Sequence, residues 1–491
     1  MRRMMVVRWA VAAAVVASGT SFGAEFAAPP LPPEVTFPSS KVVKVTEEGA
    51  VADGKTLCTE AIAKAIDECA AAGGGIVEFP KADGAYLTGR IKLKSNITLQ
   101  VDEGAVVRFA TGAEGGPLEK LYPLEKTRYE AVDVMNYSPL IYAYQCENIR
   151  ITGKGTLDGQ GQWWWAWARN PLGAAGRGRT AGSANGGSSG QGVGGTAEAK
   201  RLMGEYTRDR GGKFPLEERV FGDKNPGYRP CFIEPYECKN VVVEDVTIKN
   251  SPFWTVHPLY TTNFTLRNAN VSGEGPNTDG CDPDSCNTVL IDHVTFNTGD
   301  DCIAIKSGRD GDGIRRNRPC ENLTIRDCTM NGGHGAVTLG SETSAGIRHV
   351  LAENCVVDGP DVAIRLKSSR GRGGGFEDFM ARNIRVKSVK KQAILITLRY
   401  GSPVPATAKN ETTPVGKDLW IENLTCAAAP QAILIQGLEE SPIEDVTLKN
   451  VNITCEKGAS VDYVKGLVRE NVVITPKSGE AWKITHSTGV E

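Results

Sequence analysis

Short runs of alternating apolar and polar residues recur along most of the chain. Each run starts at a polar residue, continues through alternating apolar positions, reaches a polar corner and ends with two more apolar positions, as in residues 287–296. Alternation over so few residues is typical of β-strands and argues against helical repeats. The runs start at Asn240, Asn263, Asn287, Asn322, His349, Asp378, Asp418 and Asp445.

The corner of each run carries a second polar residue. Most of these residues are Asn or Asp, which tolerate a left-handed backbone and hydrogen-bond locally. The copies are spaced about 23 to 40 residues apart, which predicts a β-solenoid with constant walls and loops inserted on one face. The corner residues are Asp245, Asn268, His293, Asp327, Asn354, Asn383, Asn423 and Asn450.

One helix is predicted near the N-terminal end, over residues 59–72. Ile62, Ile66 and Cys69 share one face of it, and the glycines at 73–75 mark its end. An open solenoid needs its end covered, so we expect this helix to be a cap. The Gly/Ser-rich stretch at about 170–196 predicts a flexible insertion.

The first residues have the composition of an export signal. Arg2 and Arg3 precede a short apolar run, and small residues follow up to Ala24. The run is too short to span a bilayer, so residues 1–24 predict a signal peptide and a secreted or periplasmic protein. Residues 25–40 then form a Pro-rich linker, and residues 41–491 are expected to form one solenoid domain.

Four short polar clusters interrupt the strand-like segments between residues 277 and 367. If each segment is one turn of a coil, the clusters stack on one side of it, because neighbouring strands lie only about 4.8 Å apart. The clusters are Asn277-Thr278-Asp279, Gly299-Asp300-Asp301, Gly333-His334-Gly335 and Arg365-Leu366-Lys367.

Three carboxylates in one place suggest acid–base chemistry. Asp279, Asp300 and Asp301 cannot all ionise freely at close range, so at least one pKa should rise, and a raised carboxyl is a candidate general acid. Asp300 and Asp301 are adjacent and can both enter a cleft only if the chain bends, which Gly299 facilitates. A single Asp-rich cluster is as readily a turn or a calcium site; four clusters in sequence favour a catalytic site.

Composition narrows the remaining possibilities. The net charge is -2 and basic residues form no stripe, which argues against nucleic-acid binding. Thirteen cysteines in an exported chain predict a mixture of disulfides and free thiols, and Cys328 and Cys355 lie where a small apolar residue would stack in the core. No cysteine pair has metal-site spacing backed by histidines, so we expect neither a structural zinc nor a cofactor.

In this order, on a repeat of this kind, the four clusters resemble the signature segments of the polygalacturonases, glycoside hydrolase family 28; only Leu366 departs, from the usual Ile. The resemblance implies a right-handed parallel β-helix that hydrolyses α-1,4-linked galacturonate with inversion. It implies that Asp300 is the proton donor, that Asp279 and Asp301 activate water, and that His334 supports the acid.

The resemblance also suggests substrate contacts. Arg365 and Lys367 match the pair that holds the substrate carboxylate. The likeness extends to the segments around Asn277, around Lys306 and over residues 251–258, so the further candidates for substrate binding are Asn277, Lys306, Trp254 and His257. Coil spacing of roughly 5 Å between the carboxylates would by itself fit a retaining enzyme. We nevertheless expect inversion, because two carboxylates on neighbouring coils can jointly hold one water.

Other functions remain open at this stage. A β-helix pectate lyase would cleave similar polymers by elimination with calcium, a related hydrolase would require decorated pectin, and a non-catalytic solenoid would only bind carbohydrate. Residues 166–224 are long enough to wall off one end of a cleft, and the segments 340–342 and 370–374 resemble those of bacterial exo-acting members. We therefore expect an exo-acting monomer whose partners are pectin oligosaccharides, not a membrane.

Overall fold

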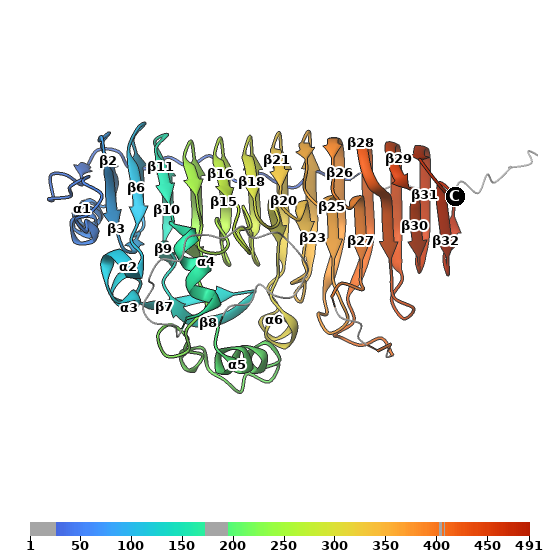
Figure 1. Cartoon of the computed structure of the whole chain (residues 1–491), viewed down its shortest axis with the longest axis horizontal. Helices are drawn as coiled ribbons and strands as arrows, with labels where there is room; N and C mark the ends of the chain where they lie inside the picture. The colour runs from blue at the N-terminus through green and yellow to red at the C-terminus, as the bar shows by residue number, and fades with distance from the viewer. Residues whose placement is uncertain (1–25, 172–194, 402–404, 407) are drawn as a thin grey trace, which may run out of the picture.

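The chain folds as one long coil of short strands. The computed structural model describes residues 26–171, 195–401, 405–406 and 408–491. The predicted export signal and most of the Gly/Ser-rich insertion lie outside these residues. Successive coils stack in a single direction from the N-terminal end to the C-terminal end (Figure 1).

Three walls of parallel strands run the length of the coil. In the first wall, each strand pairs with the strand of the next coil, so residues one coil apart lie side by side: Leu266 pairs with Ile291, and Ile291 pairs with Ile325. The first wall contains β1 (Val42–Lys44), β2 (Gly75–Phe79), β5 (Ile97–Val101), β10 (Glu147–Thr152), β13 (Lys239–Glu244), β15 (Thr262–Arg267), β17 (Asn287–Asp292), β20 (Cys320–Arg326), β23 (Ile347–Glu353), β26 (Gly375–Ser388), β28 (Val415–Gln436), β29 (Ile443–Lys457), β31 (Val464–Pro476) and β33 (Thr488–Val490).

The second wall begins after the polar corner, and the longest strands β26, β28, β29 and β31 turn this corner without interruption. Its separate strands are β3 (Ala85–Thr88), β6 (Val106–Phe109), β11 (Thr156–Asp158), β14 (Thr247–Lys249), β16 (Asn270–Gly273), β18 (Thr295–Thr298), β21 (Thr329–Gly332) and β24 (Val356–Asp358). The third wall contains β4 (Ile91–Lys92), β9 (Ile141–Tyr144), β12 (Ile233–Tyr236), β19 (Ile303–Ile305), β22 (Gly335–Leu339), β25 (Val362–Lys367), β27 (Gln392–Thr397), β30 (Ala459–Asp462) and β32 (Trp482–Thr485).

The corners are as the repeat predicts. Every corner residue named above has a positive φ, and so does every run-starting residue except Asn287, where Thr288 has a φ of 60° instead. Amide side chains at these positions bond from coil to coil: Asn423 Nδ2 donates to Asn383 Oδ1 at 3.0 Å, and Asn450 Nδ2 donates to Asn423 Oδ1 at 3.0 Å. Each corner is therefore stabilised by its neighbour as well as by its own backbone preference.

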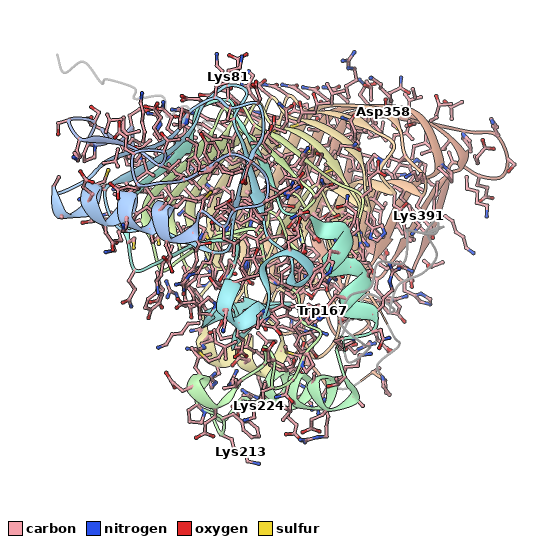
Figure 2. All side chains as sticks on the ribbon, turned by 60° about the vertical axis from the view of Figure 1, so that its left-hand side comes forward. Lys81, Trp167, Lys213, Lys224, Asp358 and Lys391 are labelled. Atoms are coloured by element: carbon pink, nitrogen blue, oxygen red, sulfur yellow. The ribbon has the colours of Figure 1, made fainter. Side chains whose placement is uncertain are left out.

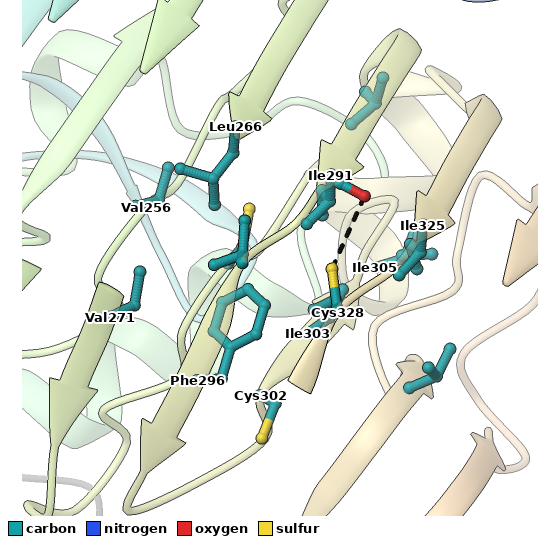
Figure 3. Close-up of a cluster of buried hydrophobic side chains, with 14 of the residues drawn as sticks. Val256, Leu266, Val271, Ile291, Phe296, Cys302, Ile303, Ile305, Ile325 and Cys328 are labelled. Atoms are coloured by element: carbon teal, nitrogen blue, oxygen red, sulfur yellow. Dashed lines mark hydrogen bonds between the residues drawn. The ribbon is translucent and has the colours of Figure 1, made fainter. Parts of the chain in front are cut away.

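The interior is filled by the inward-facing residues of all three walls. Side chains of successive coils, among them Leu266, Ile291 and Ile325, stack on one another and are fully buried (Figure 3). Cysteines belong to this core: Cys328 Sγ lies 3.8 Å from the carbonyl oxygen of Ile291. All thirteen cysteines lie in the described residues and are unbonded, so the predicted mixture with disulfides is wrong. A thiol packs there as a small apolar group.

Helix α1 (Thr59–Ala71) lies at the N-terminal end of the coil, within one residue of the predicted boundaries (Figure 1). Its buried face consists of Ile62, Ala65, Ile66 and Cys69, which join the core of the first coils. The helix is thus the expected cap. The Pro-rich segment before it follows the outside of the first wall, where the Ala27 carbonyl oxygen lies 2.9 Å from His349 Nε2.

A protrusion stands on one side of the coil (Figure 1). It contains the antiparallel hairpin β7 (Leu124–Tyr129) and β8 (Val132–Tyr137), with α2 (Gly112–Gly115), α3 (Leu118–Leu121), α4 (Gly161–Arg169), α5 (Ala197–Thr207), η1 (Leu216–Glu218) and α6 (Asp310–Arg316). Lys213 and Lys224 mark its far tip (Figure 2). Tyr129, Phe221 and Phe253 belong to its own buried apolar cluster. No helix in the described part of the chain has the length and hydrophobicity of a membrane span.

Candidate active site

The three predicted carboxylates meet on the third wall. Cys281 pairs with Ile303, so Asp279 and Asp301 come just before equivalent positions of neighbouring coils. The Gly280 N–H donates to the Asp301 carbonyl oxygen at 3.0 Å and fixes this alignment. One carboxylate oxygen each from Asp279, Asp300 and Asp301 lies within 4.8 Å of the others. The coil therefore brings together the acids that the sequence places 21 and 22 residues apart.

Two glycines allow this close approach. A Cβ at Gly299 would lie 2.3 Å from the Gly275 carbonyl oxygen of the preceding coil. Gly333 has a φ of 75°, and its Cβ would lie 2.0 Å from the Asp300 carbonyl oxygen. Side chains at either position would push the coils apart. The chain bends at Gly299 and Asp300, as the adjacent acids require.

Asp301 is a buried, ionised carboxylate. Its Oδ1 accepts a hydrogen bond from Arg365 Nη1 at 2.5 Å, and its Oδ2 accepts one from Lys367 Nζ at 2.9 Å. Burial alone would raise the pKa of Asp301, but the two cations hold it well below the usual range. Such charge-assisted hydrogen bonds are strong and orient the acceptor. Both cations also lie near the ring of Tyr400, at 5.7 Å for Arg365 and 5.1 Å for Lys367.

Asp279 has the opposite electrostatic environment. It is buried, its Oδ1 has no hydrogen-bond partner, and the nearest cation is Lys306 Nζ, 3.8 Å from Oδ2. Burial, then the neighbouring Asp282 and Asp300, raise the pKa of Asp279 well above its usual value. The predicted upward shift therefore falls on Asp279. Burial likewise raises the pKa of Asp282 to about 7, against the effect of Lys306.

Asp300 and His334 form the accessible part of the site. His334 Nδ1 lies 2.9 Å from Asp300 Oδ1, and the two side chains are 49% and 19% exposed. The hydrogen bond that His334 donates to Asp300 raises the pKa of His334. A histidine that holds its proton next to a carboxyl oxygen can share that proton, so the pair is a proton reservoir facing solvent.

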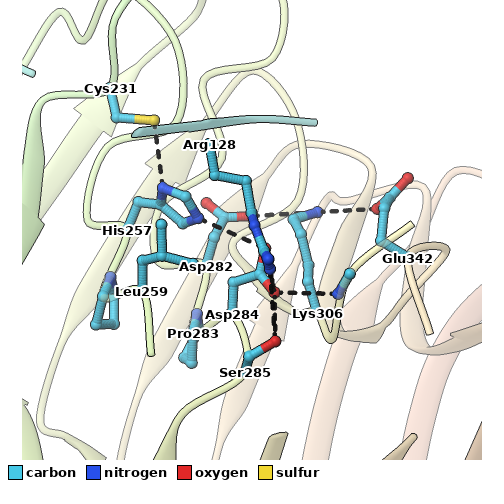
Figure 4. A network of polar contacts seen from close by, with 12 residues as sticks. Arg128, Cys231, His257, Leu259, Asp282, Pro283, Asp284, Ser285, Lys306 and Glu342 are labelled. Atoms are coloured by element: carbon cyan, nitrogen blue, oxygen red, sulfur yellow. Dashed lines mark hydrogen bonds and ion pairs between the residues drawn. The ribbon is translucent and has the colours of Figure 1, made fainter. Parts of the chain in front are cut away.

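Lys306 is the centre of a buried polar network beside these acids (Figure 4). Its Nζ lies 3.3 Å from Asp282 and 3.5 Å from Glu342, and 4.3 Å from the ring centroid of Trp254. Burial opposes its charge, but Asp282 and Glu342 raise the pKa of Lys306 well above its usual value. Lys306 is therefore a cation with three carboxylates around it, including Asp279.

Two predicted substrate contacts need correction. His257 is fully buried, and its Nδ1 lies 2.8 Å from Glu234 Oε2. The same nitrogen lies 3.5 Å from Cys231 Sγ (Figure 4). Trp254 is only 3% exposed and packs edge-to-face against His257. Both side chains lie beneath the site, where the Trp254 ring contacts Lys306 and His257 packs against that ring. Asn277, by contrast, is partly exposed next to the carboxylates.

Three groups of side chains in the described residues could hold a metal ion by proximity. In the group formed by Asp279, Asp300 and Asp301, Arg365 and Lys367 already neutralise the most acidic member, which disfavours a cation there. The other two groups are Cys231, Glu234 and His257, in which the histidine is hydrogen-bonded to the other two, and Asp292, His293 and Asp327.

The comparisons with known proteins agree with this geometry. The sequence model described as Glycosyl hydrolases family 28 matches residues 217–473. The chain is 30% identical, over 82% of its length and 72% of the relative's, to a "Probable polygalacturonase" of Vitis vinifera. The chain belongs to glycosyl hydrolase family 28. This makes it a glycoside hydrolase, and the alternative of a non-catalytic carbohydrate-binding solenoid is not favoured.

Two further relatives of this family 28 enzyme are exo-acting by name. An "Exo-poly-alpha-D-galacturonosidase" of Dickeya chrysanthemi is 30% identical over 73% of the chain and 57% of the relative. The solved structure of a hyperthermoactive exopolygalacturonase from Thermotoga maritima superposes with a TM-score of 0.78 at 35% identity, covering 92% of this chain and 94% of that one. The predicted all-β, right-handed parallel β-helix is thereby confirmed.

The sequence did not point to every residue of the site in this family 28 enzyme. Asp282 and Glu342 flank Lys306. In the sequence they stood out only as members of longer segments that resemble those of the family. Nothing in the sequence indicated Tyr400, because this residue lies in a loop outside the repeat. Asp282 could have been found from its position three residues after Asp279 in an Asp-rich segment.

Proposed function

We propose that the enzyme hydrolyses the α-1,4-galacturonosidic bonds of polygalacturonate in a single displacement with inversion. The observation that carries this proposal is the opposite electrostatics of three adjacent carboxylates. Asp301 is held ionised by two cations, Asp279 is buried without a hydrogen-bond partner for Oδ1, and Asp300 is accessible next to a protonatable histidine. Pairs of carboxyl groups with different environments are typical of acid and base in glycosidases.

Asp300 protonates the leaving oxygen. It is the most exposed of the three acids, and His334 replenishes its proton through the 2.9 Å contact. The reacting water loses its proton to Asp279, whose raised pKa gives it the higher proton affinity. Asp301 orients that water, because its ionised oxygens are fixed by Arg365 and Lys367.

Asp301 is not placed to act as a nucleophile. Both oxygens of Asp301 already accept charge-assisted hydrogen bonds, which lowers their tendency to form a bond to the sugar. Asp279, once ionised, is the stronger base because its pKa is raised, and it takes the proton of the attacking water. A double displacement needs a free carboxylate, so these environments support a single displacement by water.

The substrate's own carboxylate binds to the cations around the acids. Arg365 and Lys367 have donors beyond those used on Asp301, and Arg365 Nε is buried without a partner. Lys306 is as buried as Trp254 and lies near Asp282 and Glu342, so it adds its positive charge from beneath the site without a direct contact. Lys367→Ala should therefore raise KM for polygalacturonate, while a methyl-esterified substrate, which lacks the charge, should lose less; equal losses would contradict this role.

The protrusion supports exo action. Glu130, at the tip of the β7–β8 hairpin, is paired with Arg309 at 2.5 Å, so the hairpin reaches across to the loop after β19. On the opposite side, Trp165 of α4 donates from Nε1 to the Ser251 carbonyl oxygen at 3.0 Å. These inserted elements pack on the coil of Asp301 and on a coil N-terminal to it, where a longer chain would have to pass. Cleavage should therefore release one or two sugars from a chain end.

The experiment is a product analysis on polygalacturonate. Monomer or dimer without a ladder of oligomers is the expected result, and proton NMR should show the β-anomer first. An initial α-anomer would refute single displacement, whereas unsaturated, ultraviolet-absorbing ends would indicate a lyase. Turnover only on rhamnose- or xylose-decorated pectin would move the substrate to that class.

We also propose that the protein is exported to the periplasm or the medium and acts there as a monomer. The basic and apolar composition of residues 1–24 supports export. N-terminal sequencing of the mature protein from cell fractions tests export, and light scattering after gel filtration tests the oligomeric state. An intact N-terminus in the cytoplasmic fraction, or a defined oligomer, would contradict these two statements.

A further inference from the structure

Arg229 is a buried arginine at the edge of the active site. It follows the inserted segment and precedes β12, and only 1% of it is exposed. Its Nη1 donates to the carbonyl oxygens of Pro252 and Pro276, both at 2.7 Å, and its Nη2 donates to Asn277 Oδ1 at 2.9 Å. The guanidinium therefore bridges two consecutive coils directly beside the predicted catalytic cluster.

This arginine differs from the other deeply buried arginines of the protrusion. Arg128 pairs with Asp133 and Asp284, and Arg219 pairs with Asp209 and Asp312. Arg229 has no carboxylate within ion-pair distance among the residues that the structure describes, and its Nε has no partner. An unpaired buried charge is costly, and a neutral side chain could crosslink two carbonyls at lower cost. The contact with Asn277 is what a guanidinium adds.

The guanidinium determines how the Asn277 amide is turned. Arginine can only donate, so the atom of Asn277 that faces Arg229 must be the acceptor Oδ1. The amide nitrogen then points away from Arg229, and none of the hydrogen bonds within the described residues uses it. Asn277 is partly exposed and lies two residues before Asp279. Its two N–H groups are thus available to a ligand bound over the carboxylates.

Packing holds the guanidinium in this orientation. Its carbon lies 5.1 Å from the ring centroid of Phe253, and that ring stacks on Tyr129 of the hairpin at 4.5 Å. Planar stacking together with the three fixed acceptors leaves the group little freedom to rotate. The protrusion therefore contacts the edge of the active site through Arg229.

We propose that Arg229 is a positioning residue that fixes Asn277 as a hydrogen-bond donor to the sugar bound over Asp279. This rests on the proposed function, since it assumes a uronate sugar at that position. A sugar hydroxyl or ring oxygen accepts from Asn277 Nδ2. Without Arg229 the amide can flip and present its oxygen, which cannot donate.

The test is a double-mutant cycle on purified full-length protein with polygalacturonate. Arg229→Met should lower kcat/KM by about 5- to 100-fold in the wild-type background. In the Asn277→Ala background the same change should have almost no further effect on kcat/KM. An equal loss in both backgrounds, or wild-type kcat/KM in Arg229→Met, would overturn the proposal.

Arg219→Met is the matched control, because Arg219 is an equally buried arginine of the protrusion without a contact to Asn277. It should destabilise the protein, and its effect on kcat/KM should be the same with Asn277 present or absent. A loss that depends on Asn277 for Arg219 as well would mean that general loosening of the protrusion explains the result.

Asn277→Asp gives a second readout that needs no activity. The new carboxylate retains the acceptor for Arg229 and supplies the carboxylate that Arg229 lacks. With Arg229 present, the melting temperature should therefore rise or stay constant, while kcat/KM falls at least fivefold. In the Arg229→Met background, Asn277→Asp should lower the melting temperature. A fall in melting temperature in both backgrounds would refute the contact. If wild type does not cleave polygalacturonate, the proposed function fails, but this stability comparison still decides whether Arg229 holds residue 277.

Discussion

Replacing Asp279 or Asp301 by Asn should change stability in opposite directions, although both changes should abolish turnover. The two side chains are buried on neighbouring coils and differ mainly in their partners. Asp301 accepts hydrogen bonds from Arg365 and Lys367, whereas Asp279 Oδ1 has no partner. Asn has nearly the volume of Asp, so the substitutions change charge and leave packing intact.

Asp279→Asn should stabilise the protein at neutral pH. Removing a buried carboxylate that lacks a hydrogen-bond partner relieves about 1 to 3 kcal/mol. The pKa of Asp279 is raised in the folded state, mainly by burial, so its ionisation opposes folding once the pH exceeds the unfolded value of about 3.9. The advantage of the Asn variant should therefore grow as the pH rises from about 4 towards the folded pKa.

Asp301→Asn should destabilise the protein. It leaves Arg365 and Lys367, whose side chains are only 11% and 7% exposed, without their carboxylate. Breaking a buried ion pair in this way costs about 3 to 5 kcal/mol. The pKa of Asp301 is lowered in the folded state, so its contribution is complete above the unfolded value of about 3.9 and is lost as the pH falls through the folded pKa.

The assay is thermal unfolding by circular dichroism at pH 5 and pH 7, with turnover measured on the same samples. For a chain of this length, about 1 kcal/mol shifts the melting temperature by roughly 1 °C. We expect about 1 to 3 °C higher for Asp279→Asn and about 3 to 5 °C lower for Asp301→Asn at pH 7. Stabilisation by Asp301→Asn, or destabilisation by Asp279→Asn that grows with pH, would refute the charge states assigned here.

Four further outcomes are expected. Asp300→Asn should lower kcat by about 10² to 10⁴ with an unchanged melting curve, and activity within tenfold of wild type would count against the proton donor. His334→Gln should move the alkaline limb of the kcat/KM profile to lower pH, because His334 holds a proton for Asp300 and its pKa is raised; an unmoved limb would exclude the shared proton. Asn423→Gly should cost less stability than Asn423→Ala. Both variants lose the hydrogen bonds to Asn383 and Asn450, but only Ala is strained at a φ of 53°. Equal losses in urea unfolding would show that the backbone conformation contributes little. A reducing agent should leave the melting temperature unchanged, because the thirteen cysteines are unbonded, and a drop would reveal a disulfide.

The local pattern of the sequence was sufficient to predict the coiled fold. Alternating apolar residues with Asn or Asp at fixed corners predicted strands and turns, because period-two burial and left-handed corners are properties of a few consecutive residues. The same reasoning placed α1 and its end at the glycines. Parallel pairing of the strands then followed from the repeat, because runs with corners at the same positions place the strands of successive coils side by side in the same direction.

The candidate acids were also visible in the sequence, since four polar clusters interrupt a regular repeat. Their charge states were not. The raised pKa falls on Asp279, whereas the resemblance alone assigned the proton donor to Asp300. Arg365 and Lys367 pair with Asp301 because of the directions in which side chains on neighbouring coils point. These directions are set by backbone bends at positions such as Gly299.

The tertiary structure alone decided the depth of each side chain and the contacts of the protrusion. His257 and Trp254 lie in a segment similar to known substrate-binding enzymes, yet both are buried. His257 contacts Glu234 and the Trp254 ring, and that ring lies next to Lys306. Arg229 reaches Asn277, 48 residues further along, only because residues 199–228 pack against Phe253 and Trp254 of the coil. A repeat fixes what lies one coil away, but contacts made by loops outside the repeat have no period, and the sequence carries no spacing from which to predict them.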